Sequence, residues 1–156
     1  SMITGVLFVL NAIRLASWYT NGIWQKPLLW SLYIAYGFIV LGFLLHSLLF
    51  LGWFNVFIPI HAIAVGGVGF LTLSMMARVS LGHSGRSINE PSKLIVLAFP
   101  ILILTAVVRI FMPLLFPESY LLWIWVSQIL WITAFSLFVI VYLPVLVQPR
   151  TDGRTG

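Results

Sequence analysis

Long apolar runs, broken only by short polar connections, constrain this chain more than any other feature. Five such runs cover residues 3–18, 28–51, 56–81, 94–112 and 120–147. The last four have at least the roughly 17–25 residues that a helix needs to cross a bilayer, and tilt absorbs the excess length of the longest. None of them shows the alternating pattern of a membrane β-barrel. The sequence therefore predicts an all-α, polytopic integral membrane bundle of five transmembrane helices, or four and a partial one if the short first run does not cross.

The composition supports a membrane protein and excludes several classes of function. The chain is 62% hydrophobic and only 7% charged, whereas soluble domains carry about 25% charged residues. It has no cysteine, which excludes disulfides, thiolate metal sites and thiol catalysis. The net charge of +5 follows from the basic bias of cytoplasmic loops, so the predicted partner is the lipid bilayer and not a nucleic acid. No P-loop, GxGxxG or HExxH motif and no carboxylate pair supports a nucleotide-binding enzyme or a hydrolase.

The basic residues gather on one side of the predicted bundle. With five alternating spans, the connections at 19–27 and 82–93 and the tail at 148–156 share a side. The basic residues of that side are Lys26, Arg86, Lys93, Arg150 and Arg154. The connections of the opposite side offer only Glu118. The positive-inside rule therefore places the tail 148–156 in the cytoplasm and residue 3 outside.

Two of the three histidines, His46 and His61, flank a tight connection marked by Gly52 and Asn55. Neighbouring antiparallel helices bring both imidazoles to one depth near the outer face. Neutral imidazoles from facing helices are the ligands that a haem or a copper ion requires inside a bundle. Arg109, near the same end of its run, is suited to pair with a haem propionate or another anion. The alternatives are an interhelical hydrogen bond for each histidine and snorkelling to the headgroups for Arg109.

A second polar group lies at the opposite, cytoplasmic end. The sequence Gly82-His83-Ser84-Gly85 predicts a tight turn, and the flanking Arg78 and Arg86 suit an anion or, alternatively, anionic lipid. His83 is a third candidate metal ligand. By helix rise it lies on the order of 30 Å from His61, so these two cannot bind one ion.

Glycines are the other notable feature of the run that contains His61. Gly66 and Gly69 permit close approach of another helix, or leave room for a flat macrocycle against the backbone.

The segment from His61 to Arg86 combines these features in one order. It begins His61-Ala62, continues through the spaced glycines, and ends Met75-Met76-Ala77-Arg78-Val79-Ser80-Leu81-Gly82-His83-Ser84-Gly85-Arg86. This resembles the signature of the NnrS family, where HA and a glycine-containing helix precede MxxRxSLGHTGR. Ser84 stands where threonine is common. The matching positions are His61, Arg78, His83 and Arg86, whereas His46 is a candidate on depth alone.

The resemblance implies a bacterial inner-membrane protein that contains haem and copper, responds to nitric oxide and relieves nitrosative stress, often under regulation with denitrification genes. Family members are usually longer and carry N-terminal histidine motifs absent here. The chain is therefore expected to be a C-terminal portion or a short member that pairs with further helices or forms a homo-oligomer. Enzymatic turnover stays open. Two other functions also stay open: a transporter or channel module for an anion or small solute, and a structural subunit that completes a larger bundle.

Overall fold

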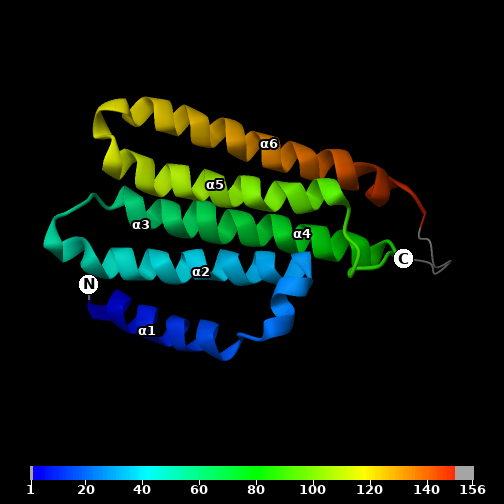
Figure 1. Cartoon of the computed structure of the whole chain (residues 1–156), viewed down its shortest axis with the longest axis horizontal. Helices are drawn as coiled ribbons and strands as arrows, with labels where there is room; N and C mark the ends of the chain where they lie inside the picture. Colours follow the sequence, from blue (N-terminus) through cyan, green and yellow to red (C-terminus); the bar gives the residue numbers. More distant parts are fainter. Residues whose placement is uncertain (1, 150–156) are drawn as a thin grey trace.

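The computed structural model describes residues 2–149, and these form a bundle of roughly parallel and antiparallel helices (Figure 1). No strand occurs among the described residues. Four helical segments are long and apolar enough to cross a membrane: Pro27–Leu51, Phe57–His83, Lys93–Leu115 and Pro117–Val147. The predicted all-α membrane bundle is therefore confirmed.

The first helix, α1 (Met2–Ser17), has 16 residues and no buried residue. At 1.5 Å per residue it is about 24 Å long, which is short for a crossing of ~30 Å. A 3-10 turn at Asn21–Gln25 connects α1 to the next helix, α2 (Pro27–Ser47). The first helix packs along α2 at the edge of the bundle (Figure 1). The structure thus has four full-length candidate spans and one partial helix, the second of the two arrangements predicted.

If α1 is counted as the first, the second span begins with α2, continues through a 3-10 turn at Leu48–Leu51 and ends at Gly52. Gly52 has a φ of +71°, in the left-handed region that favours glycine, so the chain reverses there.

The third span lies at the centre of the bundle, and its helix type changes along its length. It comprises α3 (Phe57–His61), a π-helical segment (Ala62–Gly69) and α4 (Phe70–His83). The last two spans are α5 (Lys93–Leu115) and α6 (Tyr120–Val147), which pack against each other along their lengths. Half of the third span and 44% of the α5 span are buried, against about a fifth of the second span and of the α6 span, so the third span and α5 form the centre of the packing.

The glycines of the π-helical segment meet large side chains of neighbouring helices. A Cβ added at Gly66 would lie 2.5 Å from Cγ of Phe38, and one at Gly69 would overlap the ring of Trp131. Side chains of this chain therefore fill the space beside both glycines. The glycines permit close helix packing, and they leave no room there for a flat macrocycle.

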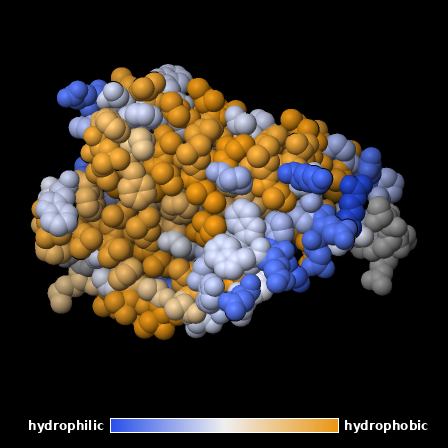
Figure 2. Space-filling view, viewed as in Figure 1, coloured by the Kyte–Doolittle hydropathy of each residue, from blue (hydrophilic) through white to orange (hydrophobic). Residues whose placement is uncertain are grey.

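The bundle surface is apolar over most of its length, and hydrophilic residues concentrate at one end (Figure 2). That end holds the connection between α4 and α5, with Arg86 and Lys93. The connections at the opposite end, between α2 and α3 and between α5 and α6, contain one charged residue, Glu118. This asymmetry is the one that the sequence predicted.

Candidate functional site

The most polar contact within the spans joins α3, α5 and α6. Nη2 of Arg109 lies 3.3 Å from Nε2 of His61. Nη1 of Arg109 donates to Oγ of Ser127 at 3.2 Å, and Ser127 in turn donates to the carbonyl of Ile124 at 2.8 Å. Arg109 lies six residues before Leu115, the end of α5, or about 9 Å along the helix axis. Three spans are therefore linked through one membrane-embedded guanidinium.

The hydrogen bonds of His61 determine which ring nitrogen carries the proton. A guanidinium can only donate, so Nε2 of His61 accepts from Arg109. The proton therefore lies on Nδ1, and the imidazole is neutral. This is the tautomer of a histidine whose Nε2 binds a metal and whose other nitrogen is fixed by a carbonyl.

A small cavity opens beside this contact, with a volume of about 110 Å³. Its lining comes from the π-helical segment, α5 and α6: Val65, Thr105, Arg109, Ser127, Gln128 and Trp131. Thr105 donates its hydroxyl to the carbonyl of Ile101 at 2.8 Å. The tip of the Trp131 ring packs over Gly69, so the indole forms one wall.

The π-helical segment begins directly after His61 and supplies Val65 to the cavity. Segments of this kind widen the helix locally and often occur at functional sites. The widening changes which residues face α5 and α6 in the following turns. Through Val65 this segment therefore contributes to the wall of the cavity next to the histidine.

His46 lies near the end of α2, half-buried, and its Nδ1 is buried without a hydrogen-bond partner among the described residues. Gly42 packs on Ile63 and Phe38 on Gly66, so α2 runs antiparallel to the third span. His46 consequently lies toward the same bundle end as His61. No hydrogen bond joins the two rings. Their use as ligands of one cofactor stays a prediction.

Metal-binding side chains are sparse in the described part of the chain. Residues 2–149 contain no group of three or more His, Asp or Glu side chains close enough to hold a metal ion. His83 is exposed at the far end of α4. Of the predicted candidates, the structure brings together His61 and Arg109, places His46 at the same end, and leaves His83 apart.

The turn after α4 has a structural explanation. The N–H of Arg86 bonds to the carbonyl of Leu81 at 3.0 Å, and that of Gly85 to Gly82 at 3.3 Å. Gly85 has a φ of +73°. This pattern is a Schellman cap, in which glycine ends a helix in the left-handed conformation. The predicted tight turn is present, and helix termination accounts for Gly85.

The two arginines around this turn lie in different settings. Nη2 of Arg86 donates to Oε1 of Gln148 at 2.9 Å, which ties the turn to the end of α6. Arg78 is half-buried on α4. A cavity of about 540 Å³ between the turn and α6 is lined by Arg86, Glu90 and the buried Tyr142, together with neighbouring residues.

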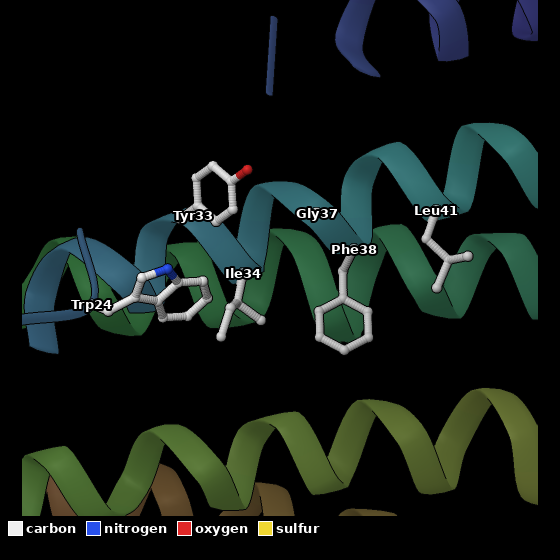
Figure 3. A pocket seen from close by; sticks show the side chains of 6 residues that line it. All are labelled: Trp24, Tyr33, Ile34, Gly37, Phe38 and Leu41. Carbon is white, nitrogen blue, oxygen red and sulfur yellow. The ribbon is translucent and has the colours of Figure 1, made fainter. Parts of the chain in front are cut away.

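Two further cavities lie on α2 and hold no histidine. One, of about 310 Å³, is lined by Trp24, Tyr33, Ile34, Gly37, Phe38 and Leu41 (Figure 3). The other, of about 560 Å³, lies between α2, α4 and the segment after α1, and its lining is also mainly apolar. These surfaces suit lipid chains and offer no imidazole to a metal.

Ser127, Thr105, Gln128 and Trp131 are site residues that sequence reasoning did not assign. Serine and threonine are common in membrane helices, where they allow close packing, and both bond to their own helix backbone here. The only sequence feature that could have indicated this site was Gln128, whose amide side chain lies within an apolar run.

Comparison with known proteins agrees with the signature in the third span. No curated protein and no solved structure matches this chain. A family model described as "NnrS protein" matches residues 2–150. This match extends far beyond the segment from His61 to Arg86 and covers nearly all of the sequence. The chain therefore belongs to the NnrS family.

Proposed function

We propose that this chain binds a redox metal cofactor, haem first and copper second, and acts in the response to nitric oxide and the relief of nitrosative stress. The observation that carries the proposal is the buried, unpartnered Nδ1 of His46, at the bundle end where His61 also lies. Membership of the NnrS family supports it, because the family resemblance implies both metals.

The donor chemistry fits such a cofactor. His61 has the tautomer of a ligand through Nε2, and His46 has a nitrogen without a partner. Imidazole is a common ligand of both haem iron and copper. A metal would take the Nε2 lone pair that Arg109 now occupies, which would free the guanidinium to pair with a propionate.

The available volume places a limit on where a haem binds. Pockets for ligands of drug size measure roughly 300–1,000 Å³, whereas the cavity beside Arg109 measures about 110 Å³. A porphyrin does not fit inside this cavity. Both histidines are only half-buried, so a haem would lie at the edge of the bundle at their end, covered by further helices or a second copy, and the His46 side chain would have to turn its buried Nδ1 toward it.

Within this proposal the residues have distinct tasks. His46 and His61 would hold the metal, Arg109 would balance negative charge, and the surrounding apolar side chains would exclude water. When bound, the metal would supply the centre at which nitric oxide binds.

The physiological role can be tested in a bacterial strain that is sensitive to nitric oxide. Cells that express this chain are expected to resume growth sooner after exposure to a nitric oxide donor than cells that express the variant with alanine at both His46 and His61. The His83→Ala variant is the control and should protect like the parent. Equal recovery of cells with the chain, the double variant and empty vector would contradict the role.

We also propose that the protein lies in the bacterial inner membrane with its basic end in the cytoplasm. There Arg78 and Arg86 would contact anionic headgroups or other anions.

The proposed orientation leads to a labelling prediction. The chain has no cysteine, so single cysteines can be placed at exposed positions of opposite ends, Ser87 and Ser119. In intact cells, a membrane-impermeant maleimide that reaches only the periplasm should label Ser119→Cys and spare Ser87→Cys. Both should react after the membrane is disrupted. The reverse pattern in intact cells would show that the orientation is inverted.

A further inference from the structure

We infer that the cavity beside Arg109 binds a small monovalent anion within the membrane-spanning bundle. The inference goes beyond metal binding, because it concerns the metal-free chain. It rests on the charge of Arg109, its donor geometry and the volume of the cavity.

The charge of Arg109 is not balanced by the described residues. The two groups that contact its guanidinium, His61 and Ser127, are neutral. No ion pair involves Arg109 within residues 2–149. The described carboxylates, Glu90 and Glu118, lie in the connections between spans. A cation in a low-dielectric environment is costly unless an anion compensates it, so the surroundings of Arg109 favour a negative ligand.

The donors that face the cavity are suited to an anion. A guanidinium has five N–H groups, and the bonds to His61 and Ser127 use two of them. Nε is buried without a partner, and Arg109 lines the cavity. Gln128 adds an amide to the lining. The hydroxyls of Ser127 and Thr105 already donate to backbone carbonyls, so the remaining side-chain donors of the lining are those of Arg109, Gln128 and the indole of Trp131.

The size of the cavity selects the class of ligand. A water molecule takes roughly 30 Å³ in the liquid, so a cavity of about 110 Å³ has room for an ion of the size of chloride or nitrate together with a water molecule or two. An organic anion as large as gluconate does not fit. The guanidinium of Arg109 is also held by His61 and Ser127, about 9 Å along the helix axis from the end of α5.

Thermal unfolding of the purified, metal-free protein in neutral detergent tests the inference. Sodium chloride or nitrate is compared with sodium gluconate at equal ionic strength. Chloride or nitrate at about 100 times its Kd should raise Tm by on the order of 5 °C relative to gluconate. Arg109→Gln should remove the shift. Arg14→Gln should keep it, because Arg14 lies on α1 over the rings of Trp18 and Tyr36.

A second variant covers the case in which Arg109→Gln does not fold. Val65→Phe leaves the guanidinium in place but fills part of the cavity, so it should also abolish the shift. Equal Tm values in chloride, nitrate and gluconate for the parent protein would overturn the inference. A Tm shift in Arg109→Gln or Val65→Phe as large as that of the parent protein would also overturn it. If phosphatidylglycerol in gluconate stabilises the parent but not Arg109→Gln while chloride has no effect, a lipid phosphate is the ligand and the small-anion assignment is wrong.

Discussion

Alanine at both His46 and His61 is expected to remove almost all of the haem absorbance of the protein. Neither residue has a nearby histidine substitute in the described structure, because His83 lies at the other end of the bundle. Loss of an axial ligand shifts the spectrum or releases the haem. Each single variant should therefore reduce or shift the Soret band, and the double variant should be close to colourless. The measurement is the absorbance per mole of purified protein after growth with added haem.

The matched control for this experiment is His83→Ala. His83 lies on the order of 30 Å from His61 along the third span, so its loss should leave the band close to that of the parent by the same ligation argument. A double histidine variant that retains a full, unshifted band would contradict ligation by these residues. The Arg109→Gln variant tests the pairing of the guanidinium with a haem propionate, because it should weaken haem retention only if that pair forms.

Valine at Gly66 is expected to have the second largest effect, in this case on stability. A Cβ at this position would lie 2.5 Å from Cγ and 2.9 Å from Cβ of Phe38. These atoms are at the base of the ring and cannot move aside without a change in helix packing. Overpacking of this kind costs about 1–3 kcal/mol, occasionally more. The free energy of unfolding in mixed micelles measures the loss.

Gly82 provides the control for Gly66. A Cβ at Gly82 would have no heavy atom within 4 Å, so Gly82→Val should change stability by no more than a few tenths of a kcal/mol, as is usual for surface positions. Adding Phe38→Ala to Gly66→Val should recover part of the loss by removing the clash. Equal stability of the Gly66 and Gly82 variants would show that close packing at Gly66 is not required.

Sequence reasoning predicted the spans well, because hydrocarbon thickness fixes the length of apolar runs. The predicted run at 120–147 coincides with α6 (Tyr120–Val147), and the other long runs end within a few residues of the observed helices. The first run, at 3–18, was ambiguous because its length falls between a span and a shorter helix, and α1 is indeed short.

The contact between His61 and Arg109 could not be predicted in the same way. Depth follows from position in a span, but the direction of a side chain depends on the rotation of each helix. The third span also contains a π-helical segment directly after His61, whose extra width no periodicity in the sequence reveals. Sequence reasoning placed His46, His61 and Arg109 at one end, and the structure pairs Arg109 with His61 and Ser127.

The turn at Gly82–Arg86 shows a different limit of prediction from sequence. Its glycines and arginines suggested an anion site, but the Schellman cap at Gly85 and the bond between Arg86 and Gln148 explain part of the pattern through helix termination and packing. The local sequence could indicate a tight turn. The contact with Gln148, distant in sequence, became apparent only in the folded chain.

Haem and copper content of the purified protein tests the central proposal most directly. We expect close to one haem or one copper ion per chain, measured by pyridine haemochrome absorbance and by elemental analysis. The chain is prepared alone and after co-expression with the N-terminal helices of a longer NnrS protein. Metal only in the co-expressed sample would mean that the additional helices complete the site around His46 and His61. Absence of both haem and copper from both samples would contradict the account.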